Sequence, residues 1–342
     1  MQELSFPFAE PPPPGTRKPL LDGLAWVRQP LPFALDHVNC WWLEDTASTA
    51  GRVLVDTGIA SGLMRKGWQQ LLAGRLPDTL LVTHFHPDHS GLAGWFAEQG
   101  SRLLGSEVEM NLANEIWSTD DEVYGALYAD WYMQNGLADD VVEHVAGQGN
   151  SFRKIVQALP EGFSWLKEND CVTLAGRDYQ VMIGRGHAPA MLMLYCEAEH
   201  LLIAADQVLP TISPNVSLMP LTRDDNPLAS FLDTLKQLKK LPEDTLVLPS
   251  HGLPFHGLHV RLNALEQHHQ LRLSEVLDAC AEPRTAAALF PVLFRRQLDA
   301  QQMSFALGES LAHLRYLERR GDVVAECKSD GVSMQQRYCR SC

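Results

Sequence analysis

Apolar positions along the chain alternate between short continuous runs and stripes with helical spacing. Short apolar runs bounded by turn residues are typical of buried strands, and spacing near 3.6 residues is typical of amphipathic helices. The runs predict strands at residues 24–27, 39–43, 52–56, 79–84, 201–205 and 246–249. Helical spacing predicts helices at 61–73 and 231–241. Because strands and helices alternate, we expect a layered α/β sandwich.

Residues 106–168 interrupt this alternation and are predicted to be a largely helical insertion. Its helices are expected at 108–117, 122–134, 141–145 and 152–159. Large side chains recur along its middle part at helical spacing, which is typical of a helix packing face. An apolar insertion can also line a substrate pocket. Tyr128 and Trp131 are therefore candidate pocket residues, and packing is the alternative for the same stripe.

The pattern changes again near the end of the chain, where it becomes mostly helical. Helices are predicted at 259–281, 284–294 and 305–320, the last ending at Gly321, followed by a hairpin of 322–327 and 334–338 around 329–331. Residues 1–20 contain the proline run 11–14 and are expected to be an extended arm. The chain thus divides into an arm at 1–20, a catalytic α/β domain at 21–258 and a C-terminal domain at 259–342.

Charge is distributed unevenly between these parts. The chain of 342 residues has a net charge of −14. Residues 256–342 contain eleven Lys and Arg against ten Asp and Glu, or +1, so residues 1–255 carry −14 − 1 = −15. An acidic body repels phosphate backbones, and a nucleic-acid enzyme needs a basic track. We therefore expect a small-molecule substrate, with a nucleic-acid partner as the less favoured alternative.

Two further features bear on location and redox state. The chain has no apolar run of about 18 residues and no basic-then-apolar leader, so we expect no membrane span and a cytoplasmic protein. The seven cysteines are scattered, which does not indicate a disulfide framework. The pair Cys339 and Cys342 has CxxC spacing, but a zinc site needs two more ligands nearby, so a frayed tail is expected, with a redox or accessory metal role as the alternative.

Candidate metal chemistry is concentrated directly after the run at 79–82. Four potential ligands, His84, His86, Asp88 and His89, lie within six residues. A strand directs alternate side chains to one side, so His84 and His86 can reach one metal. After the chain turns, Asp88 and His89 can reach a second. Imidazole and carboxylate ligands suit zinc first, with manganese or iron as alternatives.

Three other apolar segments end in a potential ligand. Residues 181–187 end in His187, residues 201–206 in Asp206, and residues 246–252 contain His251. Upstream, the segment 52–58 reads Arg-Val-Leu-Val-Asp-Thr-Gly. This ordered set, covering about residues 20–255, resembles the metallo-β-lactamase-fold hydrolases and their HxHxDH signature.

The resemblance implies a four-layered αββα sandwich with two divalent metal ions. It implies that His84, His86 and His187 hold the first ion and that Asp88, His89 and His251 hold the second. It further implies that Asp206 bridges both ions and that Asp56 orients a ligand from behind, as metal-bound histidines require. The end of the chain resembles a winged-helix domain, such as follows the hydrolase domain in a branch that includes β-lactamase-like endoribonucleases.

The sequence departs from the family pattern after His187. The family often has a hydroxyl residue, a glycine and a polar residue there, whereas this chain has Ala188-Pro189-Ala190-Met191. This wall of the site is therefore expected to be more apolar, with Met191 as a candidate pocket residue.

The leading hypothesis is a dinuclear metal-dependent hydrolase in which a metal-bridged hydroxide attacks a small ester or thioester. Asp88 is expected to orient the attacking water and accept its proton. By analogy with the hydroxyacylglutathione hydrolases, a carbonyl substrate is preferred. The first alternative is a metal-dependent endoribonuclease acting on single-stranded RNA, with an oxygen-reducing di-iron protein or a non-enzymatic binding protein less favoured. The C-terminal domain is then expected to serve packing or homodimer formation.

Overall fold

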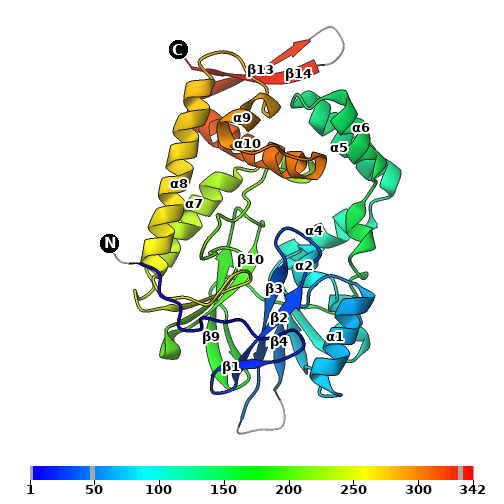
Figure 1. The fold of residues 1–342 in the computed structure, drawn as a ribbon, viewed down its shortest axis with the longest axis vertical. Helices are drawn as coiled ribbons and strands as arrows, with labels where there is room; N and C mark the ends of the chain where they lie inside the picture. Colours follow the sequence, from blue (N-terminus) through cyan, green and yellow to red (C-terminus); the bar gives the residue numbers. More distant parts are fainter. Residues whose placement is uncertain (1–2, 47–50, 330–333, 342) are drawn as a thin grey trace. The chain divides into compact units, whose positions relative to one another are not determined.

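The computed structural model describes residues 3–46, 51–329 and 334–341. It contains two compact units (Figure 1), each assembled from separate segments of the chain. The first unit comprises residues 1–118, 152–214 and 237–262, and the second comprises 119–151, 215–236 and 263–342. The contiguous boundaries at residues 20 and 258 remain a prediction.

A mixed sheet of seven strands, counted over the described residues, forms one half of the first unit. Its strands follow each other in chain order: β1 Lys18–Leu21, β2 Leu24–Pro30, β3 His37–Leu43, β4 Val53–Val55, β5 Thr79–Leu81, β6 Arg102–Gly105 and β7 Ser164–Trp165. Strands β1 to β4 pair antiparallel, and β4 to β7 pair parallel. The carboxyl ends of β4 and β5 therefore lie at the same edge of this sheet.

A second sheet has the order β12-β11-β10-β9-β8. Its strands are β8 Cys171–Leu174, β9 Arg177–Gly184, β10 Met191–Cys196, β11 Leu201–Ala205 and β12 Leu246–Pro249. Strand β11 is parallel to β12 and antiparallel to β10, and β10 is antiparallel to β9. As a result β9, β11 and β12 run in one direction and end at a common edge.

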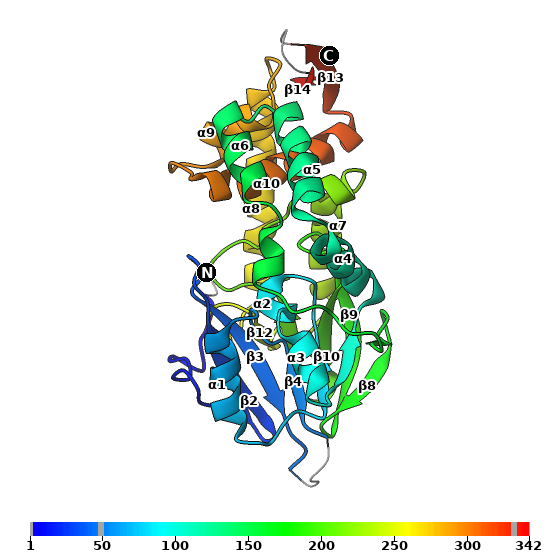
Figure 2. The same ribbon diagram turned by 90° about the vertical axis from the view of Figure 1, so that its right-hand side faces the viewer.

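The two sheets face each other across a shared apolar core (Figure 2). Trp26 and Trp41 from the first sheet and Leu192 and Ile203 from the second belong to this core and are almost fully buried. A second core covers the outer face of the seven-stranded sheet, where Trp68 of α1 (Gly62–Leu72) packs edge-on against Phe96 of α3 (Ala93–Glu98). The predicted α/β class is confirmed.

The second unit is mainly helical. Its described elements are α5 Asp121–Gln134, α6 Asp139–Gly147, α9 Phe290–Leu293, α10 Ala300–Arg320 and the hairpin of β13 Val323–Ser329 with β14 Met334–Arg340. Helices α7 Pro227–Leu238 and α8 Leu258–Ala279 have residues in both units. Helix α10 ends at Gly321, which has φ = 81°, as the sequence predicts. It begins earlier than residue 305 because Asp299 caps it through Gln302 N–H. The predicted turn at 330–331 lies outside the described residues, as does Cys342.

The predicted helix at 152–159 is wrong. Only a 3₁₀ turn at Ser151–Lys154 forms, and the following backbone bonds to other loops. Ile155 O accepts from Ala60 N–H at 2.7 Å, and Gln157 N–H donates to Gly91 O at 2.8 Å. These tertiary hydrogen bonds replace the helical ones, which local propensity cannot foresee.

The predicted helix at 284–294 is only partly correct. Arg284 and Tyr338 exchange two backbone hydrogen bonds, so the beginning of this segment extends the hairpin β13–β14 instead of forming a helix. A 3₁₀ turn follows at Ala287–Leu289, and only Phe290–Leu293 is α-helical. Among the described residues, no helix of the protein combines the length and apolarity needed to cross a bilayer.

Candidate metal centre

The predicted ligands follow the carboxyl ends of strands from both sheets of the first unit. The loop after β5 and the short helix α2 (Pro87–Ser90) carry the motif of residues 84–89. The segments after β9, β11 and β12 carry His187, Asp206 and His251. Leu192 N–H donates to Thr83 O at 2.8 Å, which ties the second sheet to the loop that begins the motif.

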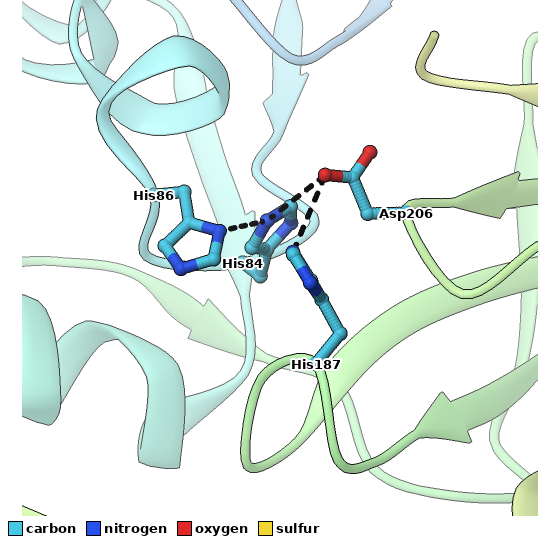
Figure 3. A group of neighbouring side chains, drawn as sticks. All are labelled: His84, His86, His187 and Asp206. Atoms are coloured by element: carbon cyan, nitrogen blue, oxygen red, sulfur yellow. Dashed lines mark hydrogen bonds and ion pairs between the residues drawn. The ribbon is translucent and has the colours of Figure 1, made fainter. Parts of the chain in front are cut away.

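Three histidines and one aspartate form the first group (Figure 3): His84, His86, His187 and Asp206. Each offers one ligand atom, and these atoms all lie within 4.8 Å of one another. His84 Nε2 lies 3.0 Å from His86 Nδ1, and His187 Nε2 lies 3.3 Å from Asp206 Oδ2. Nitrogen and oxygen atoms this close, all pointing to one spot, are arranged as the ligands of a single cation would be.

Asp88, His89 and His251 form the second group, with the same mutual limit of 4.8 Å. Asp88 Oδ2 lies 3.3 Å from His89 Nε2 and 3.5 Å from His251 Nε2. The Asp88 side chain is 21% exposed, whereas that of His89 is fully buried. Asp88 is therefore the member of this group that solvent or a substrate can reach.

The Asp206 carboxylate touches both groups. Besides its contact with His187, its Oδ2 lies 3.5 Å from His89 Nε2, and its Oδ1 lies 3.4 Å from His251 Nε2. Oδ2 thus lies beside histidines of both groups and Oδ1 beside His251 of the second, so this carboxylate could serve as a ligand shared by both groups. The bridging role itself remains a prediction.

Asp56 supports this arrangement from behind. Thr83 donates to its two oxygens, from N–H at 2.9 Å and from Oγ1 at 2.8 Å, and His89 Nδ1 lies 2.8 Å from Oδ2. This contact makes His89 Nδ1 the protonated nitrogen and leaves Nε2 to face the group. Asp56 has φ = 61°, an uncommon conformation for a non-glycine residue, and the hydrogen bonds hold it there.

The loop that carries His251 is held by strand β3. His251 Nδ1 donates to His37 O at 2.6 Å. The buried side chain of Asn39 donates to Pro249 O at 2.8 Å and to Gly252 O at 3.0 Å. Its own oxygen accepts from Trp26 Nε1 at 2.8 Å, so every polar atom of this amide is used. The direction of the His251 ring is thereby fixed by the backbone of β3.

Burial lowers the pKa of some ligand histidines, and neighbouring carboxylates raise the pKa of others. Burial lowers the pKa of His84 well below its usual range and that of His86 to about 3, so both are neutral, the state that binds metal. Burial also opposes a charge on His89, but Asp88, Asp206 and Asp56 raise its pKa. The pKa of Asp206 is held well below its usual range because His251 and His89 outweigh burial. An ionised Asp206 carboxylate surrounded by histidine nitrogens attracts a cation.

The polar atoms around the Asp206 carboxylate fit a divalent ion. His89 Nε2 and Asp206 Oδ1 are buried and have no hydrogen-bond partner within the described structure. Buried polar atoms without partners are costly, and a bound cation would satisfy both. Histidine with carboxylate is also a donor set that zinc, manganese and iron accept.

The three predicted pocket residues are not brought together by the described contacts. Met191 is fully buried in β10 and belongs to the first unit. Tyr128 and Trp131 lie on α5 of the second unit, where the Tyr128 ring stacks on Tyr124 with centroids 4.3 Å apart. The role of all three as pocket walls stays a prediction.

Comparisons with known proteins agree with this site. The sequence pattern of the Metallo-beta-lactamase superfamily matches residues 34–251, which include every predicted ligand. The chain belongs to the metallo-beta-lactamase superfamily. A second pattern, the Metallo-beta-lactamase-like C-terminal domain, matches residues 273–338. The proposed likeness to a winged helix stays a prediction.

Several relatives match two thirds or more of this superfamily member. A crystal structure of a beta-lactamase domain protein from Burkholderia ambifaria is 40% identical, with a TM-score of 0.91 over 99% of this chain and 98% of that one. The probable metallo-hydrolase YqjP of Bacillus subtilis is 24% identical over 90% of this chain and 95% of its own length. The human acyl-coenzyme A thioesterase MBLAC2 is 24% identical over 68% of this chain and 80% of its own length.

Sequence reasoning missed three residues that support the superfamily's metal loops here. Asn39 and His37 hold the His251 loop, and the buried carboxylate of Glu109 in α4 (Glu107–Ser118) accepts from two loop amides. A signal existed for Asn39, a polar residue in the apolar run 38–43. Glu109 also lies on the buried side of its helix, beside Met110. A buried polar residue could thus be suspected at both positions, but the sequence does not indicate which loop its side chain contacts.

Proposed function

We propose that this protein is a metal-dependent hydrolase that acts on a small ester or thioester. The observation that carries the proposal is the pair of adjoining ligand groups that share the Asp206 carboxylate. His84, His86, His187 and Asp206 would hold one divalent ion, and Asp88, His89 and His251 would hold the other, with Asp206 between them. Zinc is the first choice, with manganese or iron as alternatives.

When bound, such ions supply Lewis acidity, which makes water more acidic and a carbonyl group more electrophilic. The chain's own contribution begins with Asp88. Its partial exposure lets it reach a bound water, and its pKa lies below the usual range because His89 and His251 outweigh the effect of burial. Asp88 is then a carboxylate at neutral pH, whose oxygen can accept a hydrogen bond and orient a water molecule for attack.

Three observations favour a carbonyl ester over a phosphodiester. The net charge of −15 over residues 1–255 (−14 for the chain, less +1 for 256–342) disfavours a polyanionic substrate. One relative is named as an acyl-coenzyme A thioesterase, and another as a probable metallo-hydrolase. The loop at Ala188 and Ala190 is buried and apolar, in keeping with a site for an acyl group.

A substrate panel tests the proposal. Acyl thioesters, lactones, aryl esters and single-stranded RNA would be incubated with protein stripped of metal and with protein resupplied with zinc or manganese. We expect metal-dependent turnover of at least one carbonyl ester and none of RNA. His86→Ala should abolish it, whereas His256→Ala, which removes a histidine outside both groups, should not. Cleavage of RNA at physiological salt, without turnover of any ester, would replace the proposal with the nuclease alternative.

A further inference from the structure

Glu109 is a fully buried carboxylate whose contacts all lie on the metal loops or near them. Its Oε2 accepts from Phe85 N–H at 3.1 Å, and its Oε1 accepts from Ala190 N–H at 2.5 Å. Phe85 is the residue between His84 and His86, and Ala190 follows His187 by three positions. One side chain therefore joins the two loops that supply all three histidines of the first group.

A buried carboxylate has a considerable energetic cost unless its oxygens are well bonded. Burial indeed raises the pKa of Glu109 to about 7, although the two amides and His187 favour its charged form. The cost of burying this carboxylate is offset in part by the two backbone hydrogen bonds that it accepts. What an apolar residue cannot do is accept hydrogen bonds from two loops that come from different sheets.

We infer that Glu109 is a positioning residue that holds the His84–His86 loop and the His187–Ala190 loop at the separation required by one metal ion. This inference rests on the proposed metal centre. Among the described residues, the side-chain hydrogen bonds of Glu109 reach the two loops of the first ligand group and not the loop of His251, so Glu109 should act mainly on the first group. Asn39 is its counterpart for the second group, since its amide holds the loop of residues 249–252.

The chemistry of the two amides predicts how substitutions rank. Glu109→Gln keeps the shape but has one oxygen, so it can accept from only one loop and presents an NH₂ group to the other amide. Glu109→Ala leaves both amides without an acceptor. The effect on the first metal should therefore increase from Gln to Ala.

Stepwise metal affinity of the full-length protein is the decisive readout. Zinc would be titrated against a chromophoric chelator, with cobalt absorption as a second signal for each site. His86→Ala, which removes a ligand of the first group, assigns the two affinities. We expect Glu109→Gln to weaken the first site by about 10- to 100-fold, as is usual for groups that orient metal ligands, and to weaken the second site much less. Asn39→Ala should show the reverse pattern.

A stability control separates positioning from simple packing. Thr245 is fully buried in the same unit, and its hydroxyl donates to Pro242 O at 2.7 Å, away from both ligand groups. Thr245→Val should lower the melting temperature without changing the ratio of the two affinities. If Glu109→Gln lowers the melting temperature but leaves that ratio unchanged, or weakens both sites equally, the inference is wrong. A wild-type protein that binds no metal would instead overturn the proposed function and the inference together.

Discussion

At the scale of single residues, the site depends on a few carboxylates that each serve several histidines. Asp206 contacts histidines of both groups, and Asp56 fixes His89 while bonding to the backbone and hydroxyl of Thr83. Each of these carboxylates is buried, so its loss leaves several polar atoms without partners. Substitution of Asp206 or Asp56 should therefore weaken metal binding more than the loss of a single carboxylate would suggest.

The first prediction concerns Asp206. Asp206→Ala should reduce metal occupancy at both sites, because the carboxylate faces both ligand groups. His251→Ala removes a contact from the second group alone and should empty mainly one site. Elemental analysis after dialysis, combined with chelator competition, measures both. If Asp206→Ala empties only one site, the bridging assignment fails.

The second prediction concerns Asp56. Asp56→Asn keeps a residue that tolerates positive φ, so the backbone at 61° is preserved while the negative charge is lost. His89 then loses the partner that fixes its tautomer, and we expect metal affinity at the second site to fall by about 10- to 100-fold. Stepwise zinc titration measures the change. Unaltered metal affinity in a folded Asp56→Asn variant would show that Asp56 only supports the backbone near Thr83 and does not orient His89.

At the scale of elements, parallel strand ends determine where the ligands meet. Strands β4 and β5 end together, as do β9, β11 and β12, so ligands distant in sequence converge at the strand ends. The helical elements of the second unit are organised differently. There, helices α8 and α10 bury a pair of histidines, and α5 carries three tyrosines whose rings are in contact.

The third prediction concerns pH. His269 Nδ1 lies 3.3 Å from His313 Nε2, and His313 Nδ1 donates to Glu309 O. Burial lowers the pKa of His269 to about 3 and that of His313 to about 4. The unfolded chain then binds more protons, so stability is retained above pH 6.5 and falls as pH drops toward the folded pKa values. The free energy of unfolding is expected to fall by at most about 1.4 kcal/mol per pH unit for each histidine.

Urea unfolding at several pH values tests this slope. The double variant His269→Gln/His313→Gln should have a shallower slope than wild type between pH 6.5 and 4.5, and His84 and His86, whose pKa values burial also lowers, account for part of the slope that remains. His144→Gln changes an exposed histidine of α6 and should leave the slope unchanged. Equal slopes in the double variant and wild type would contradict the assignment.

The fourth prediction concerns α5. Tyr128 stacks on Tyr124 and meets Tyr132 edge-on at 5.8 Å, and burial raises its pKa. Because the Tyr128 side chain is only half-buried, we expect Tyr128→Ala to cost about 0.5–3 kcal/mol in the free energy of unfolding. Thermal melting and KM for a bulky ester would be measured together. A raised KM with an unchanged melting temperature would instead support the predicted pocket role.

At the scale of the whole molecule, the sequence reveals what is local and periodic. The contiguous motif at 84–89 and the apolar strands before each ligand could be recognised directly, and the two ligand groups contain all seven residues predicted as ligands. The irregular backbone at 152–159 could not be predicted, because its hydrogen bonds go to Ala60 and Gly91, which are distant in the sequence. Glu109 escaped for a related reason, since its partner Ala190 lies 81 positions away along the chain.

The central claim is that these residues form a two-metal hydrolytic centre, and the metal content of active protein tests it most directly. Full-length protein purified without added chelator would be analysed for metals and assayed on the same sample with the best ester of the panel. The account predicts about two divalent ions per chain. It also predicts that activity is lost as they are removed and regained when they are restored. Full activity in protein that contains no metal would contradict it.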